Sequence, residues 1–269
     1  VYVPVTHWVW GGGIMAGWGV MDFAGGIVVH ATAGTAALVC AVIVGKRRHF
    51  PQSQIPPHSP ALTMIGASML WVGWFGFNGG SALGAGGGAG MALLVTHIAA
   101  ATASLVWMGL EWMRFGRPSL VGIATGMVAG LATVTPASGF IGVPGGLILG
   151  LAGGFGCYIA VDIIRGKLKI DDSLDVFAVH GVGGIIGSLM VAFLALPSFG
   201  GLGLADGVTP GSQFMVQLAS VAITVAWTLM VSVIILMVAK AVAGLRVDDQ
   251  TEVDGLDLAE HGERGSPGN

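Results

Sequence analysis

The sequence predicts an all-α integral membrane protein, and its composition carries this prediction. Of the 269 residues, 54% are hydrophobic and only 9% are charged, whereas soluble domains carry about 25% charged residues. Glycine is abundant, with 47 residues, as expected where membrane helices approach one another closely. Cys40 and Cys157 each lie in an apolar run. We interpret both as small packing residues with no disulfide or metal role.

Seven segments are long and apolar enough to cross a bilayer, which takes about 20 mostly apolar residues. They cover residues 23–45, 61–82, 89–113, 119–136, 140–164, 176–197 and 212–243. Residues 1–245 are therefore expected to form a transmembrane domain, and residues 246–269 a tail.

The positive charges predict the orientation of these spans. With seven spans, every lysine and arginine falls on one side of the membrane, while residues 83–88, 137–139 and 198–211 on the other side contain none. Positively charged loops stay in the cytoplasm, so the C-terminus is expected inside the cell and the protein in the plasma or inner membrane. The cationic residues are Lys46, Arg47, Arg48, Arg114, Arg117, Arg165, Lys167, Lys169, Lys240, Arg246 and Arg264.

The tail has a composition unlike that of the rest of the chain. Residues 246–269 hold seven of the 14 acidic residues and very few large apolar ones. The sequence leaves two interpretations open, a disordered solvated end and a docked regulatory element.

Two histidines lie within segments that only a membrane span would hold. His30 ends the run DFAGGIVVH, and His180 lies in DVFAVHGVGGIIG. An ionisable side chain at bilayer depth is costly, so both histidines are functional candidates. Asp22 and Asp175 precede them and are expected to cap the helix N-termini. Helix length neither demands nor excludes a meeting of the two histidines near the midplane.

Aromatic and hydroxyl side chains are placed to form an outer entrance. Trp10 and Trp74 offer ring faces that attract cations, and Ser81 offers a hydroxyl at the outer end of the second span. An ordinary interfacial aromatic belt is the alternative. Phe77 and Asn78 follow Trp74 along the same helix.

Several motifs occur in the order in which they are found in one known family. They are WGGG (10–13), DFAGGIVVH (22–30), WFGFNGGSA (74–82), TPASGFIGVPGGLILG (135–150), DVFAVHGVGGIIG (175–187) and GLD…HGE (255–263). From end to end the chain closely resembles the ammonium transporter (Amt/Rh) family, and Trp10 with Ser81 indicates its Amt branch. The resemblance implies an eleven-span fold of inverted repeats, of which this chain carries the last seven.

The resemblance also implies roles for the candidate residues. Trp10, Ser81 and Trp74 would bind ammonium at the outer side. Phe77 would be one of two stacked phenylalanines that gate the pore. His30 and His180 would form a hydrogen-bonded pair lining an apolar pore, along which ammonia crosses while its proton travels separately. Asp22, Asp175 and Asn78 would support the site structurally and electrostatically.

The partners follow from the same resemblance. They are ammonium or ammonia, the lipid bilayer, two further copies in a homotrimer, and a PII-type signalling protein at the tail, with no nucleic acid and no cofactor. The second interpretation is an ammonium sensor that signals through the tail. An enzyme is not expected, because the sequence has no metal triad, nucleophile motif or phosphate loop.

Overall fold

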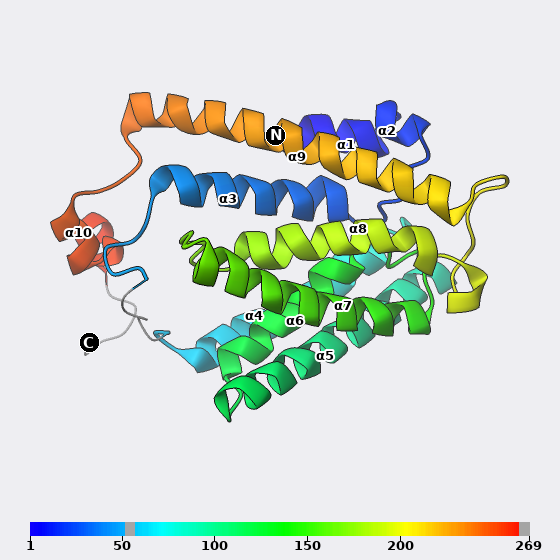
Figure 1. Ribbon diagram of the computed structural model, residues 1–269, viewed down its shortest axis with the longest axis horizontal. Helices are drawn as coiled ribbons and strands as arrows, with labels where there is room; N and C mark the ends of the chain where they lie inside the picture. Colours follow the sequence, from blue (N-terminus) through cyan, green and yellow to red (C-terminus); the bar gives the residue numbers. More distant parts are fainter. Residues whose placement is uncertain (52–56, 264–269) are drawn as a thin grey trace.

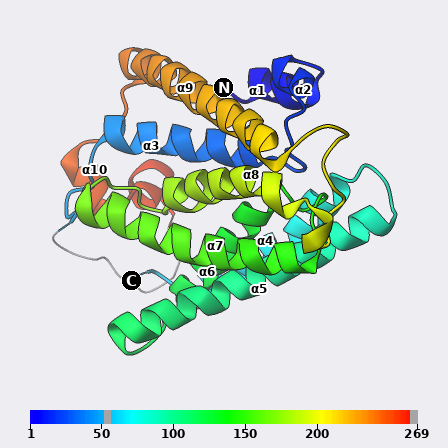
Figure 2. The ribbon, with the colours of Figure 1, turned by 45° about the vertical axis from the view of Figure 1, so that its right-hand side comes forward.

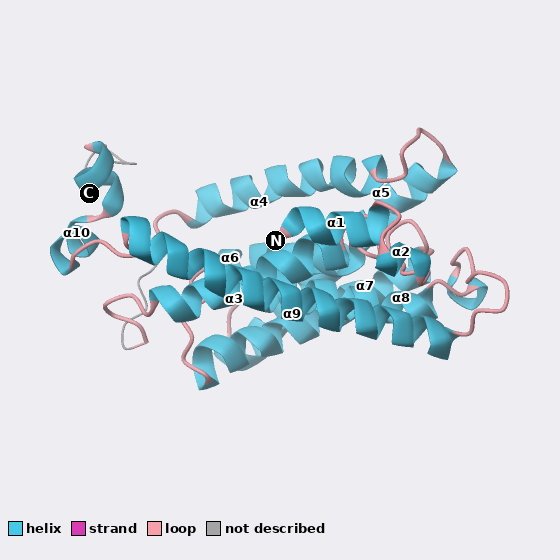
Figure 3. Cartoon of the chain, turned by 90° about the horizontal axis from the view of Figure 1, so that it is seen from above, coloured by secondary structure: helices cyan, strands magenta, loops and turns pink. Residues whose placement is uncertain are grey.

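The computed structural model describes residues 1–51 and 57–263, which form helices and loops without a strand (Figure 3). This confirms the all-α fold class. Seven apolar helical segments occupy the seven predicted ranges, and six of them are long and apolar enough to cross a membrane. Those six are Gly26–Val44, Pro60–Gly79, Gly87–Phe115, Val143–Lys167, Phe177–Leu194 and Pro210–Ala243.

Four of these segments combine α-helical and π-helical geometry along their length. In chain order the main elements are η1 (Gly26–Ala31) with α3 (Thr32–Val44), α4 (Pro60–Trp74) with η2 (Phe75–Gly79), α5 (Gly87–Phe115), α6 (Leu120–Val134), α7 (Val143–Val161) with η3 (Asp162–Lys167), η4 (Phe177–Gly181) with α8 (Val182–Leu194), and α9 (Pro210–Ala243). π-helical turns are rare and occur mostly at functional sites. Here the turns η1 and η4 contain His30 and His180.

The seventh segment, α6, is the shortest and the most enclosed. Its 15 residues extend only about 22 Å, against a hydrocarbon core of about 30 Å. It packs against α4, α5, α7 and α8, and ten of its residues are buried. Because α6 is surrounded by other helices and not by lipid, it does not need to match the thickness of the hydrocarbon core.

The bundle has two sides. Helices α3 and α9 lie next to each other on one side and α5 on the other, with α6, α7 and α8 between them (Figures 1 and 2). The C-terminal ends of α3, α5 and α9 lie toward the left of Figure 1, where α10 (Asp249–Asp254) also lies. Lys46, Arg47 and Arg48 follow α3, Arg114 and Arg117 lie at the end of α5, and Lys240 and Arg246 lie at the end of α9, so these three cationic clusters share one end of the bundle.

Local sequence signals explain where several helices begin. The hydroxyl oxygens of Ser59 and Ser119 accept hydrogen bonds from the first turns of α4 and α6. Thr209 and Ser212 form a capping box at the start of α9. Proline follows the cap in α4 and α9, where its missing N–H costs nothing.

A helix that the sequence analysis did not predict precedes the first span. This is α1 (Tyr2–Trp10), followed by the short α2 (Ile14–Gly17). The Trp8 ring meets the edge of Trp227 on α9 at a centroid distance of 5.3 Å. Through this contact α1 packs on α9, and Trp10 lies at the C-terminal end of α1.

Candidate functional site

The histidines of the two π-helical turns, His30 and His180, meet. Nδ1 of His30 lies 3.2 Å from Nδ1 of His180, and the ring centroids are 5.2 Å apart. One ring must therefore donate and the other accept, so the pair holds a single shared proton between its facing nitrogens. His30 is buried at 3% exposure, and its Nε2 has no hydrogen-bond partner among the described residues.

Two glycines allow the histidine-bearing helices to cross this closely. A Cβ on Gly34 would collide with the backbone of Gly181. A Cβ on Gly184 would lie 2.6 Å from Cβ of His30 and 2.8 Å from the carbonyl oxygen of Gly26. Any side chain at either glycine would force the helices apart and separate the imidazoles.

Both carboxylate oxygens of Asp22 cap the helix that contains His30. Oδ1 accepts from the backbone N–H groups of Gly25 and Gly26 at 3.0 and 2.6 Å, and Oδ2 from those of Ile27 and Val28 at 2.9 and 3.0 Å. These are the N–H groups that a helix N-terminus leaves unsatisfied. The capping role expected of Asp22 is what its geometry provides.

The cap of the second helix is Asp172, and the prediction that Asp175 caps it is wrong. Asp172 accepts from the N–H of Val176 at 2.9 Å and of Phe177 at 2.8 Å. Asp175 has a positive φ of 54° and its carboxylate faces Arg165 at 3.3 Å. The turn places Asp175 beside the helix entrance, so its side chain cannot reach the free N–H groups.

The two halves of the site repeat the same spacing. His30 is the eighth residue after Asp22, and His180 is the eighth residue after Asp172. Four further residues lead to Gly34 and to Gly184. The cap, histidine and glycine therefore form an internal repeat, as expected of an inverted-repeat architecture. Counting back from each histidine would have identified Asp172 from the sequence.

Aromatic rings cover the histidine pair. Trp74 stacks on His30 at 5.4 Å with an interplanar angle of 21°, and on His180 at 6.4 Å and 13°. Its Nε1 donates to Oγ1 of Thr135 at 2.9 Å, which fixes the ring. Phe77 meets His30 edge-on at 6.1 Å. Trp74 thus lies at the histidine pair, and the sequence analysis did not single out Thr135.

An apolar groove of about 560 Å³ opens beside these rings. It is lined by Val29, His30, Gly66, Met69, Leu70, Gly73, Trp74 and Phe77. His30 is the one titratable side chain in this lining, so the groove presents an imidazole to an otherwise apolar space.

Trp10 and Ser81, the candidates for the outer site, donate hydrogen bonds to backbone carbonyl oxygens. Nε1 of Trp10 donates to the carbonyl oxygen of Asp22 at 2.7 Å, while 43% of the residue stays exposed. The hydroxyl of Ser81 donates to the carbonyl of Phe77 at 2.7 Å. Asn78 is fully buried and donates to Oγ1 of Thr96 at 2.9 Å, which ties η2 to α5. Trp10 therefore presents its ring face, and Ser81 retains an acceptor.

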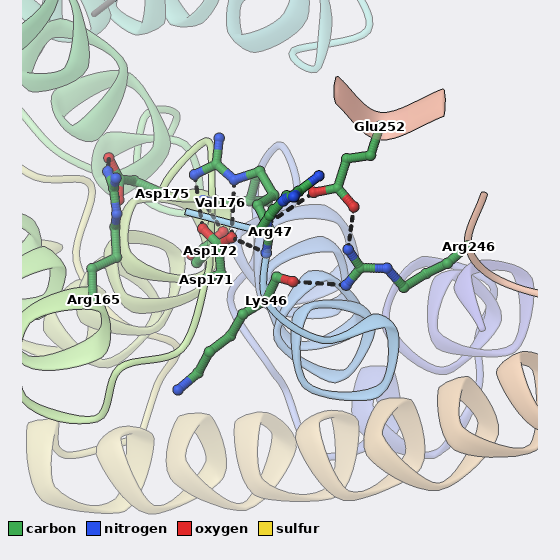
Figure 4. A network of polar contacts seen from close by, with 10 residues as sticks. Lys46, Arg47, Arg165, Asp171, Asp172, Asp175, Val176, Arg246 and Glu252 are labelled. Atoms are coloured by element: carbon green, nitrogen blue, oxygen red, sulfur yellow. Dashed lines mark hydrogen bonds and ion pairs between the residues drawn. The ribbon is translucent and has the colours of Figure 1, made fainter. Parts of the chain in front are cut away.

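A charged network covers the other end of the bundle (Figure 4). The guanidinium and backbone N–H of Arg47 donate to Asp171 at 2.8–2.9 Å. Burial alone would raise the pKa of Asp171, but the hydrogen bonds from Arg47 outweigh it and hold that pKa below its usual range. Burial raises the pKa of Asp175 to about 6, although the nearby positive charge of Arg165 lowers it.

The described part of the tail docks on this end. Arg246 donates to the carbonyl oxygens of Lys46 and Val44 and pairs with Glu252 (Figure 4). Glu252 also accepts from the backbone N–H of Arg48 at 2.9 Å. Helix α10 and η6 (Asp257–His261) follow. Of the two interpretations of the tail, docking describes residues 246–252, whereas residues 256–263 are exposed and residues 264–269 lie outside the described residues.

Comparison with known proteins assigns the chain to a family. The model of the Ammonium Transporter Family matches residues 1–266. The chain belongs to the ammonium transporter family. It is 49% identical to ammonium transporter Amt1 of Archaeoglobus fulgidus, over 98% of this chain and 66% of that protein. It is 44% identical to an ammonium transporter of Aquifex aeolicus, over 98% and 61%.

Solved structures agree with this assignment. A structure titled "Sensor Amt Protein" matches with a TM-score of 0.89 and 33% identity, over 96% of this chain and 66% of that one. Candida albicans Mep2 matches with a TM-score of 0.83 and 38% identity, over 93% and 58%. The chain thus spans less than two thirds of these relatives. It is a multi-pass membrane protein of a transporter family and not an enzyme.

Proposed function

We propose that the protein transports ammonium, passing ammonia and a proton separately along the histidine pair. The observation that carries this proposal is the 3.2 Å Nδ1–Nδ1 contact between His30 and His180, enclosed by apolar and aromatic groups. Relatives named ammonium transporters, matched along nearly the whole chain, support it.

The pair suits a path on which ammonium loses its proton. Two cationic imidazoles 3.2 Å apart in apolar surroundings would repel strongly, so the pair accepts one proton at a time. A neutral imidazole can accept a proton on one nitrogen and release one from the other. Ammonia is uncharged and pays little to enter the apolar groove, whereas ammonium pays the full cost of losing its water.

The outer site is proposed to attract the cation through the Trp10 ring and the Ser81 hydroxyl. The indole N–H of Trp10 already donates to Asp22, so the ring face is the part available to a cation, worth roughly 0.5–2 kcal/mol. The Asp22 carboxylate accepts four backbone N–H groups, so it supports the site through its negative potential and by holding the backbone. Asn78 is assigned a structural role in η2.

Two further roles are assigned from the rings around His30. Phe77 is proposed to gate the entrance, because it meets His30 edge-on and lines the groove. Trp74, grouped with the outer site on sequence grounds, is proposed to line the histidine pair, on which its ring stacks. Asp175, no longer a cap, supports the inner side through its pairing with Arg165.

The setting of this site is proposed from charge and family. We propose that residues 1–245 form seven membrane spans and that residues 246–269 form a cytoplasmic tail. The protein is proposed to lie in the plasma or inner membrane as a homotrimer. The cationic clusters at one end of the bundle favour a cytoplasmic C-terminus.

A sensor role is the second candidate, and the docked tail favours it. Arg246 and Glu252 bind the segment directly after α3, whose other end leads to His30. A state of the pore could therefore be read at the tail, with a PII-type signalling protein as the candidate partner. One structural relative is itself titled a sensor Amt protein.

The test is ammonium-evoked current in proteoliposomes containing the protein expressed from its complete reading frame. A saturable current that falls in Asp22→Asn supports transport, because asparagine offers one acceptor oxygen and no charge where the carboxylate offers two. A protein that binds ammonium but gives neither current nor luminal alkalinisation would contradict transport and favour the sensor.

A further inference from the structure

One buried amide on α9 joins the entrance of the His30 helix to the middle of α8, the helix that continues from His180. Gln217 is fully buried, and its Oε1 accepts from the backbone N–H of Met21 at 2.8 Å. Its Nε2 donates to the carbonyl oxygens of Met21 and Ser188, both at 2.7 Å. Oε1 also accepts from Nε2 of Gln213 at 3.2 Å. Both donors and both acceptor positions of the amide are therefore used.

The residues held by Gln217 border the functional site directly. Met21 precedes Asp22, which caps the His30 helix through its carboxylate and accepts the Trp10 indole N–H through its carbonyl. Ser188 lies on α8, eight residues after His180. Gln213 adds a hydrogen bond to the carbonyl of Gly19 at 3.0 Å. Residues 19–22 are thus held by two glutamines of α9, one of which also binds α8.

The inner half of the repeat is fastened at the equivalent position. Asp171 directly precedes the cap Asp172, and Arg47 holds Asp171 with its guanidinium and backbone N–H. Each capping aspartate therefore follows a residue that a distant side chain holds. On the inner side the fastening group is a cation, and on the outer side it is the neutral amide of Gln217.

We propose that Gln217 is a positioning residue for the outer cation site. It holds the Met21 backbone so that Asp22 places the Trp10 ring at the entrance; this rests on the proposed function. If the amide is removed, the N–H and carbonyl of Met21 and the carbonyl of Ser188 lose buried partners, and such groups are costly to leave unpaired. Residues 19–22 then move toward other partners, and Trp10 moves with them.

The first test replaces Gln217 with leucine, which has a similar volume and no hydrogen-bonding group. Ammonium-evoked current is measured in proteoliposomes containing the protein from its complete reading frame. We expect the half-saturating ammonium concentration to rise about tenfold, or about 1.4 kcal/mol, with the maximal current per folded protein within about twofold. A purely structural defect would lower yield and maximal current without shifting half-saturation.

Ser220→Ala is the matched control. Ser220 lies one turn further along α9, is fully buried and has no hydrogen-bond partner among the described residues. Its replacement should leave half-saturation at the wild-type value. An equal shift in this variant would contradict a specific role of Gln217.

Gln217→Glu provides a second readout and covers the case in which the leucine variant does not fold. A protonated glutamic acid can still donate one hydrogen bond, whereas the ionised form faces two carbonyl oxygens with no donor. Its half-saturation should therefore approach the wild-type value at low pH and diverge as pH rises. A wild-type profile at every pH would overturn the proposal, as would unchanged half-saturation in a folded Gln217→Leu variant. A wild-type protein without current would instead refute the proposed function.

Discussion

Replacing Asp172 with alanine removes the cap of the helix that contains His180. The carboxylate accepts from Val176 at 2.9 Å and from Phe177 at 2.8 Å. Hydrogen bonds to a charged group contribute about 1.5–3 kcal/mol each, while cap replacements cost about 0.5–2 kcal/mol because solvent recovers part of the loss. Asp172 is 4% exposed, so little water reaches the freed N–H groups. We expect a loss of about 2–3 kcal/mol in the free energy of unfolding.

Asp175→Asn is the matched comparison. Asparagine tolerates the positive φ of this position, and the change removes only the contact with the partly exposed Arg165. At neutral pH the change is expected to stabilise the protein by up to about 3 kcal/mol, because it removes a buried charge whose pKa burial raises to about 6.

Both variants are measured by reversible unfolding in mixed detergent micelles at pH 7. The reasoning requires Asp172→Ala to be clearly the less stable of the two. Equal losses, or a larger loss for Asp175→Asn, would show that Asp175 supports the helix and that the assignment of the cap to Asp172 is wrong.

Three other changes test the geometry of the site. Thr135→Val removes the acceptor of Trp74 Nε1 and should cost about 1–2 kcal/mol of stability and lower ammonium current, measured by unfolding and in proteoliposomes. Gly34→Ala should destabilise by at least about 1–3 kcal/mol, because its Cβ collides with the Gly181 backbone; a stable, fully active variant would contradict the close crossing. The pKa of Asp175 is raised from 3.8 to about 6, so wild-type stability relative to Asp175→Asn should fall by about 2 kcal/mol as pH rises from 4 to 6. A pH-independent difference would contradict that burial.

Much of the architecture could be predicted from the sequence because membrane helices have a simple requirement. Residues 26–44 and 210–243 are helical within three residues of the predicted limits, since long apolar runs leave the backbone few alternatives. The meeting of His30 and His180 was different. It depends on two helices crossing at Gly34 and Gly184, and no count of residues along one helix gives a crossing point.

The errors at the site came from judging side chains by proximity in sequence. Asp175 is nearer to His180 than Asp172 is, yet the positive φ of Asp175 turns its carboxylate toward Arg165. Trp74 was grouped with Trp10 at the entrance because its ring face can attract a cation, but the ring stacks on the histidines. The sequence does not distinguish Gln217 from other polar residues of an apolar span. Its role follows only from its hydrogen bonds to the backbone of Met21, which is distant in sequence.

The most direct test of the central claim measures current and luminal pH together in proteoliposomes containing the wild-type protein or the His30→Ala/His180→Ala variant. The account predicts a saturable ammonium-evoked current for the wild type, and loss of that current in the double variant. A wild-type protein that alkalinises the lumen without current, or a double variant with undiminished current, would contradict a separate proton path through the histidine pair.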